Sequence, residues 1–184
     1  MTRSGSRWRG TWALDGGGAL INQGVHTLDL LLWLLGDVER VYAKAITAFH
    51  QIETEDTVVA TLEFASGVLG TLEAATSIYP GYSRRLELTG SEGTLVIEHD
   101  RIIAADLRRP LEEGVPGMKE GTNASATSPV VSDVRGHQRI LEDFLLAVKT
   151  DGRPLCDGHE GRRSLELVQA FYQSSRTARP VTLV

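Results

Sequence analysis

The sequence predicts an α+β fold, an open and largely antiparallel β-sheet with helices packed on one face. Three observations lead to this class. Apolar residues recur at three- and four-residue steps in three segments, which is typical of amphipathic helices. Between these segments they alternate with a period of two, and turn residues separate the alternating runs at hairpin spacing. Strands grouped between helices favour α+β over a parallel sheet.

Length and composition restrict the class of protein further. The 184 residues are 41% hydrophobic and carry a net charge of −5, which suits one soluble domain with a sizeable core. The acidic balance argues against nucleic-acid binding, which needs clustered Lys and Arg. The single cysteine, Cys156, excludes an intrachain disulfide. We expect it to be buried, and we expect a cytoplasmic location. The longest nearly apolar run, 28–35, is too short to cross a membrane.

The N-terminal part divides into a loop and a helix. Residues 1–18 are predicted to be a loop that ends in Gly16-Gly17-Gly18, where the backbone can pass close to another surface. A helix is predicted over 19–35, followed by Gly36 as its C′ residue. The apolar stripe of that helix comprises Ile21, Val25, Leu28, Leu32 and Leu35. Gly24 lies inside it at a cost of about 1 kcal/mol against Ala, which indicates a close approach by another element.

Strands come next. Alternation predicts strands over 38–47, 57–64 and 68–77, the last two joined by the turn Ala65-Ser66-Gly67. A meander of strands over 84–89, 94–98 and 101–107 follows. Residues 109–132 are rich in Gly, Pro, Ser and Thr, and they predict a long excursion. Helices are predicted over 135–150 and 158–176, and a short strand over 180–184. The apolar faces of the two helices comprise Ile140, Leu141, Phe144, Leu145 and Val148, and Leu165, Val168, Phe171 and Tyr172.

One polar group stands out beside the glycine-rich loop. Asn22 and His26 are four residues apart, so a helix projects them from the same face, and Asp29 can reach that face. An imidazole exchanges protons near neutral pH, a carboxamide can hold a hydroxyl group, and a carboxylate can fix the ring tautomer. These residues suit a small polyol site, although a lone histidine on an amphipathic helix is more often structural. The other four histidines have no metal-ligand spacing, so no metal site is predicted.

The chain contains no Gly-x-Gly-x-x-Gly between a strand and a helix, so we expect it to bind no nicotinamide cofactor by itself. Several motifs, however, occur together and in a characteristic order. They are Trp8-Arg9-Gly10-Thr11-Trp12, Gly16-Gly17-Gly18-Ala19-Leu20, the run from Asn22 to Asp29, Trp33-Leu34-Leu35-Gly36, Asp56, Phe64-Ala65-Ser66-Gly67, Gly90-Ser91-Glu92-Gly93-Thr94, Phe144 and Tyr172-Gln173-Ser174-Ser175. From Trp8 to Val184 the chain resembles the C-terminal domain of the Gfo/Idh/MocA oxidoreductases.

The resemblance implies a two-domain enzyme that uses NAD or NADP to oxidise a sugar, polyol or related hydroxyl compound. In that family an N-terminal Rossmann domain holds the cofactor and supplies a lysine from a Glu-Lys-Pro motif. The C-terminal domain binds substrate and forms dimers or tetramers. His26 takes the position of the acid/base, and we expect Asn22 and His26 to be catalytic and Trp12, Asn22 and His26 to contact substrate.

Two departures from the family pattern limit what the resemblance implies. Asn22 stands where the inositol dehydrogenase pattern has an aspartate, so a shared Asp–His proton is in doubt. The second departure is that 1–184 matches the C-terminal domain alone, without a Rossmann domain or the lysine motif. We therefore expect this polypeptide not to catalyse hydride transfer alone. The alternatives are a non-enzymatic sugar-binding or assembly module derived from the family and a degenerate fragment with no present role.

The second face of the predicted sheet favours self-association. It carries Thr57, Val59, Thr61, Leu69, Thr71 and Ala75. Helices can cover only one face of a single sheet, and monomers seldom expose a large apolar patch. A homodimer or tetramer that pairs these faces is therefore expected.

Overall fold

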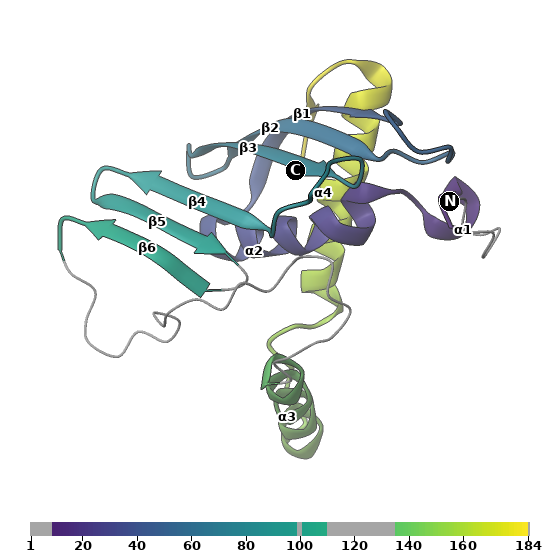
Figure 1. Ribbon diagram of the computed structural model, residues 1–184. Helices are drawn as coiled ribbons and strands as arrows, with labels where there is room; N and C mark the ends of the chain where they lie inside the picture. Colours follow the sequence, from purple (N-terminus) through teal and green to yellow (C-terminus); the bar gives the residue numbers. More distant parts are fainter. Residues whose placement is uncertain (1–8, 99–100, 110–134, 184) are drawn as a thin grey trace. The chain divides into compact units, whose positions relative to one another are not determined.

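The computed structural model describes residues 9–98, 101–109 and 135–183, and it confirms the α+β class (Figure 1). The chain forms two compact units. One comprises Met1–Ile78 and Val134–Val184, and the other Tyr79–Asp133. The candidate site residues all belong to the first unit.

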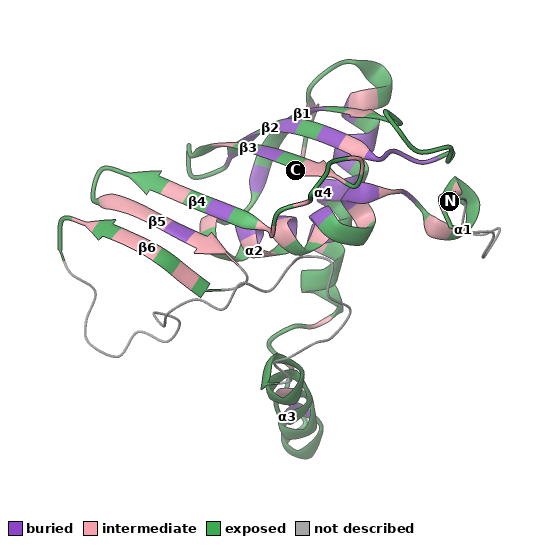
Figure 2. Ribbon diagram, in the orientation of Figure 1, coloured by how far each residue is buried: buried purple, intermediate pink, exposed green. Residues whose placement is uncertain are grey.

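The first unit contains a four-stranded antiparallel sheet in the order β3-β2-β1-β7. Its strands are β1 (Val38–Ile46), β2 (Thr57–Phe64), β3 (Leu69–Ala75) and β7 (Val181–Thr182). The predicted alternation is confirmed, and Figure 2 shows it along β2. Val58, Ala60 and Leu62 are buried, whereas Val59 and Thr61 between them are exposed. One face of this sheet therefore forms the core.

The N-terminal helical segment differs from the prediction in its first turn. The predicted loop over 1–18 contains a short helix, α1 (Trp12–Asp15). A π-helical turn, η1 (Leu20–Gly24), then leads into α2 (Val25–Leu35), where an α-helix was expected from residue 19. Gly36 ends α2 with φ +85°, as predicted. A Cβ on Gly24 would lie 3.3 Å from the Cβ of Ala74 on β3, which confirms the close approach expected there.

Helix α4 (Gly158–Thr177) packs against the covered face of the sheet (Figure 1). Asp157 caps it by accepting the N–H groups of His159 and Glu160. Its buried face comprises Ser164, Leu167, Val168, Ala170, Phe171, Tyr172 and Ser174. Leu165, which was expected on this face, is exposed, because the stripe runs through Leu167 instead.

Two serines of α4 complete the hydrogen bonding of β1. Because β7 pairs only with Arg40 and Val41, the rest of that edge of β1 needs other partners. The N–H groups of Ala43 and Ala45 donate to the hydroxyls of Ser174 and Ser175, at 2.9 and 2.8 Å. These contacts fix α4 along β1.

Helix α3 (Arg135–Thr150) spans the predicted residues, but its apolar face is exposed and only Ala147 is buried. The prediction that Cys156 is buried was wrong. It is exposed in the connection between α3 and α4, where no core element covers it. None of the helices among the described residues is long and apolar enough to span a bilayer.

The second unit holds a separate three-stranded antiparallel sheet in the order β4-β5-β6. Its strands are β4 (Arg85–Gly90), β5 (Gly93–Glu98) and β6 (Arg101–Leu107). The predicted strands are present, but they divide between two sheets. Apart from Arg109, the excursion predicted over 109–132 lies outside the described residues.

The uncovered face of the first sheet is less apolar than expected. Tyr42, Val59 and Leu69 are exposed there, together with Thr61 and Thr71, which are paired across β2 and β3. The same face also carries charged residues. They are Arg40, Lys44, Glu63 and Glu73, and Arg40 and Glu63 form an ion pair of 3.1 Å.

Candidate functional site

A buried glutamate holds the glycine-rich turn in place. The side chain of Glu55 is 3% exposed. Its two carboxylate oxygens accept the N–H groups of Gly18 and Leu20, both at 2.9 Å, and its carbonyl oxygen accepts the N–H of Ala19 at 3.0 Å. Three successive N–H groups at the start of a helical segment are thus occupied by one residue.

Glycine is required in this turn because other groups occupy the space of a side chain. A Cβ on Gly18 would overlap the carbonyl oxygen of Glu55 and lie 2.8 Å from its carbonyl carbon. A Cβ on Gly17 would overlap the hydroxyl of Tyr172. These glycines were expected to allow a close approach, and the approaching groups are Glu55 and Tyr172.

Tyr172 connects this turn to α4 and to Trp12. Its hydroxyl donates to Oε1 of Glu55 at 3.0 Å, and its ring lies edge-on to that of Trp12 with centroids 5.1 Å apart. Burial, together with the negative charge of Glu55 and the hydrogen bond to it, raises the pKa of Tyr172 well above its ordinary value. Tyr172 therefore acts here as a neutral hydrogen-bond donor.

Trp12 lies at the edge of this network. Its indole N–H donates to the carbonyl of Glu53 at 2.9 Å, and 43% of the residue is exposed. Part of an aromatic surface is thus held beside the glycine-rich turn and remains open to solvent. Such a surface suits the apolar face of a sugar ring.

Asn22 is held by the turn itself. Its N–H and its side-chain amide both donate to the carbonyl oxygen of Gly18, at 3.1 and 3.0 Å, and the side chain is exposed. Asn22 lies in the π-helical turn, a feature frequent at functional sites. A π-helical turn, with its i→i+5 hydrogen bonds, contains more residues than an α-helical turn. Asn22 and His26, four residues apart, therefore lie on successive turns of the helix.

His26 is exposed on the first turn of α2. Asp29 takes another partner, because its Oδ1 accepts the hydroxyl of Ser164 on α4 at 2.7 Å. This contact ties Asp29 to α4, and the suggestion that Asp29 orients the imidazole stays a prediction. Asn22, His26 and Asp29 are all exposed.

The segment that carries Glu55 is held in place by the hydrogen bonds of the neighbouring residue, Asp56. Asp56 is buried and accepts the N–H groups of Ala48, Phe49 and His50 and the hydroxyl of Thr57. Burial alone would raise the pKa of Asp56, but these hydrogen bonds outweigh it and hold the pKa well below its ordinary value. The carbonyl oxygen of Gly10 accepts the N–H groups of Glu53 and Thr54, which fixes this segment against the chain leading to α1.

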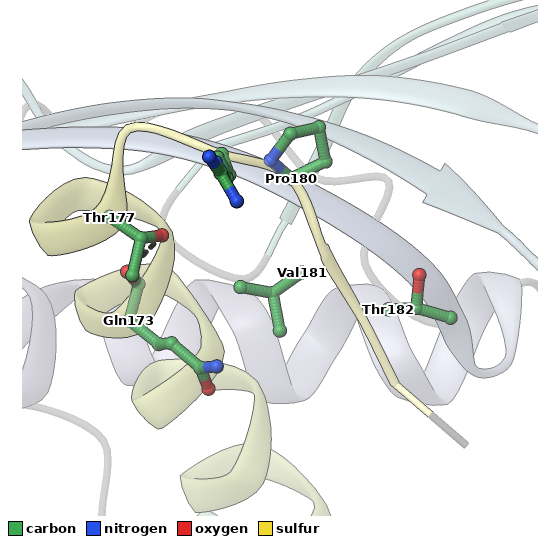
Figure 3. Close-up of a pocket in the computed structure, with 6 residues that line it drawn as sticks. Gln173, Thr177, Pro180, Val181 and Thr182 are labelled. Atoms are coloured by element: carbon green, nitrogen blue, oxygen red, sulfur yellow. Dashed lines mark hydrogen bonds between the residues drawn. The ribbon is translucent and has the colours of Figure 1, made fainter.

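An open hollow of about 560 Å³ lies elsewhere in the first unit, between the end of α4 and β7 (Figure 3). Its lining comprises Gln173, Thr177, Arg179, Pro180, Val181 and Thr182. Gln173 and Thr177 reach it from α4, Val181 and Thr182 from β7, and Pro180 from the residue just before β7. It holds one charged residue, Arg179, and none of the predicted site residues, so the glycine-rich turn remains the better candidate.

Comparison with known proteins gives a family match that includes the candidate site. The sequence profile described as the GFO/IDH/MocA C-terminal domain matches residues 2–96, which include the glycine-rich turn, Asn22, His26 and Glu55. Myo-inositol 2-dehydrogenase of Thermotoga maritima is 28% identical over 175 residues, 91% of this chain and 49% of its own length. D-apiose dehydrogenase of Paraburkholderia graminis is 28% identical over 169 residues, 87% of this chain and 43% of its own length.

Solved structures of other proteins share the fold of this chain. The WlbA dehydrogenase of Bordetella pertussis, in complex with NADH and UDP-GlcNAcA, superimposes with a TM-score of 0.79 at 32% identity. The match covers 97% of this chain and 49% of that protein. This chain therefore spans about half the length of the relatives that it matches.

Proposed function

Because the chain belongs to the Gfo/Idh/MocA family, matching its C-terminal domain, we propose that it is the substrate-binding and oligomerising part of an NAD(P)-dependent oxidoreductase. The substrate would be a sugar, a polyol or a related hydroxyl compound. The observation that carries the proposal is the exposed pair Asn22 and His26, on successive turns of a helix that starts at the glycine-rich turn. Relatives that act on inositol and apiose, and one solved with a sugar nucleotide, support this substrate class.

In this proposal the residues of the chain bind the substrate and move its proton. The carboxamide of Asn22 holds a hydroxyl group, since Oδ1 is an acceptor and the amide already donates to Gly18. The imidazole of His26 takes the proton of the hydroxyl that becomes a carbonyl. The exposed ring surface of Trp12 supports the apolar face of the sugar.

The glycine-rich turn does not fit the phosphates of a nicotinamide cofactor. Phosphates bind at helix N-termini through free N–H groups, and here those of Gly18, Ala19 and Leu20 already donate to Glu55. The carboxylate of Glu55 would also repel a phosphate. The proposal therefore assigns NAD or NADP binding to the other part of the intact enzyme.

Titration of the chain with myo-inositol, UDP-GlcNAcA and NADH, followed by NMR, tests the proposal. We expect one of the two sugar-class compounds to shift the resonances of Asn22 and His26, and NADH to shift none at the turn. His26→Ala and Asn22→Ala should weaken this binding, whereas the matched control His137→Ala, at an exposed histidine on α3, should not. If neither compound perturbs Asn22 or His26, the assignment of the site is wrong. If NADH binds at the turn with micromolar affinity, the cofactor argument is wrong.

A further inference from the structure

We propose that Glu55 is the positioning residue of the candidate site, and that it sets the place of Asn22 through the backbone of Gly18. This inference rests on the proposed function. It assigns to a buried carboxylate on a connecting loop the task of orienting the group that holds the substrate hydroxyl.

The first step is the contact between Glu55 and Gly18. Oε2 of Glu55 accepts the N–H of Gly18, and Oε1 accepts the N–H of Leu20 two residues later. Both bonds are 2.9 Å long. The bond from Leu20 is buried and the bond from Gly18 is partly buried, and Glu55 itself is 3% exposed. The carboxylate therefore holds the peptide group before Gly18 and the one after Ala19. The peptide group between them, which carries the carbonyl oxygen of Gly18, is held by the main-chain carbonyl of Glu55, which accepts the N–H of Ala19 at 3.0 Å.

The second step leads from Gly18 to Asn22. The carbonyl oxygen of Gly18 accepts two hydrogen bonds from Asn22, one from its N–H and one from its side-chain amide. The backbone of Gly18 thus transmits the position of Glu55 to the carboxamide of Asn22. No other hydrogen bond of the Asn22 side chain is formed within the described residues, which makes this contact its only defined anchor there.

The third step is the hold on Glu55 itself. Tyr172, on α4, donates its hydroxyl to Oε1 of Glu55 at 3.0 Å. Within the described residues the carboxylate oxygens accept three hydrogen bonds, from the N–H groups of Gly18 and Leu20 and from the hydroxyl of Tyr172. A glutamine at this position would turn an NH₂ group toward an N–H or O–H donor. The arrangement therefore requires an acceptor at both oxygen positions of the side chain.

The test uses the whole chain and compares Glu55→Gln with Ser174→Ala. Ser174 is also fully buried and makes two hydrogen bonds, but it lies at β1 and does not contact the glycine-rich turn. Both variants lose buried hydrogen bonds, so both are expected to lose stability. Tyr172→Phe, which removes one of the three donors and keeps the ring, provides a milder change at the turn.

Two readouts separate positioning from stability. The first, amide hydrogen exchange and the NMR signals of the Asn22 side chain, needs no ligand. We expect exchange at Gly18, Leu20 and Asn22 to accelerate by about tenfold or more in Glu55→Gln, the factor for one hydrogen bond of about 1.4 kcal/mol. The second is binding of myo-inositol or UDP-GlcNAcA, which should weaken in Glu55→Gln and remain unchanged in Ser174→Ala.

The outcomes distinguish this proposal from the proposed function. Unchanged exchange and unchanged Asn22 signals in Glu55→Gln would overturn the positioning role, whether or not a sugar binds. Altered Asn22 signals without sugar binding in the wild type would support the positioning role and contradict the proposed function. If Glu55→Gln does not fold, the same exchange and NMR measurements on Tyr172→Phe, together with the amide exchange rates of the wild type, test the positioning role. Rates at Gly18 and Leu20 as fast as at exposed amides would refute the proposal.

Discussion

Replacing Gly18 with alanine should destabilise the protein strongly, although it adds a single methyl group. That Cβ would overlap the carbonyl oxygen of Glu55, and it would lie 2.8 Å from the carbonyl carbon and 3.0 Å from Oγ1 of Thr54. Two of these neighbours are backbone atoms and cannot rotate away. The turn must therefore move away from Glu55.

The magnitude follows from the hydrogen bonds that such a movement breaks. Glu55 accepts the N–H groups of Gly18 and Leu20 through its carboxylate. A hydrogen bond to a charged group contributes about 1.5–3 kcal/mol. Loss of both gives an expected decrease in the free energy of unfolding of about 3–6 kcal/mol.

Two other Gly→Ala substitutions serve as matched controls. At Gly16 the added Cβ meets no atom within 4 Å, but φ is +73°, so only backbone strain of about 1–2 kcal/mol is expected. At Gly161, inside α4, the space is also open, and alanine should stabilise the helix by up to about 1 kcal/mol.

Urea unfolding monitored by circular dichroism gives the three free energies. The expected order of stability is Gly161→Ala, then Gly16→Ala, then Gly18→Ala. A Gly18→Ala protein as stable as Gly16→Ala would show that Glu55 and the turn are not in contact, and it would refute the site described above.

Four further predictions concern pH, chemistry and assembly. The depressed pKa of Asp56 contributes stability that is present above about pH 4, the ordinary aspartate pKa, and is lost as pH falls further. Asp56→Asn should remove this acid-dependent part of the unfolding free energy, measured by urea titration at pH 2–7. If the unfolding free energy of Asp56→Asn depends on pH as steeply as that of the wild type, the prediction is wrong. The pKa of Tyr172 is raised, so its contribution to stability is present below the ordinary tyrosine pKa of about 10 and is lost at more alkaline pH. In an absorbance titration one of the four tyrosines should resist ionisation, and Tyr172→Phe should abolish that phase. With a complementing cofactor half, His26→Ala should lower turnover by about a hundredfold or more and leave folding intact, since the side chain is exposed; unchanged turnover would make His26 structural. Light scattering over a dilution series should show a dimer or tetramer, which Val59→Glu on the open sheet face disrupts and Leu155→Glu outside it does not; a monomeric wild type at tens of micromolar would refute pairing through the sheet.

The helices and strands of this chain could be predicted because their signal is local. The period of two over 57–64 depends only on which face of one strand is buried, and the structure confirms it residue by residue. The division into two sheets could not be predicted in this way. Strands β4 to β6 follow β1 to β3 along the chain, and the sequence pattern does not indicate which strands are neighbours.

The candidate site shows a similar division between local and tertiary information. Asn22 and His26 could be selected from their spacing and from the resemblance of the surrounding motif. Glu55 could not, because its partners Gly18, Leu20 and Tyr172 lie 37, 35 and 117 residues away in the sequence. A Glu beside Asp56, just before a strand, has no local feature that distinguishes it from a solvent-exposed loop residue.

Asp29 illustrates why spacing alone is insufficient. On an isolated helix a carboxylate three residues after a histidine can reach its ring. In the folded chain Ser164 of α4 donates to Asp29, so this carboxylate links α2 to α4. For the glycine-rich turn, by contrast, sequence and structure both argue against a nucleotide site. The sequence argued against a nucleotide site there because no strand–turn–helix unit surrounds the glycines. The structure adds a separate reason, since Glu55 already takes the N–H groups that a phosphate would need. An internal anion at a helix start thus converts a potential phosphate-binding turn into a rigid support for Asn22.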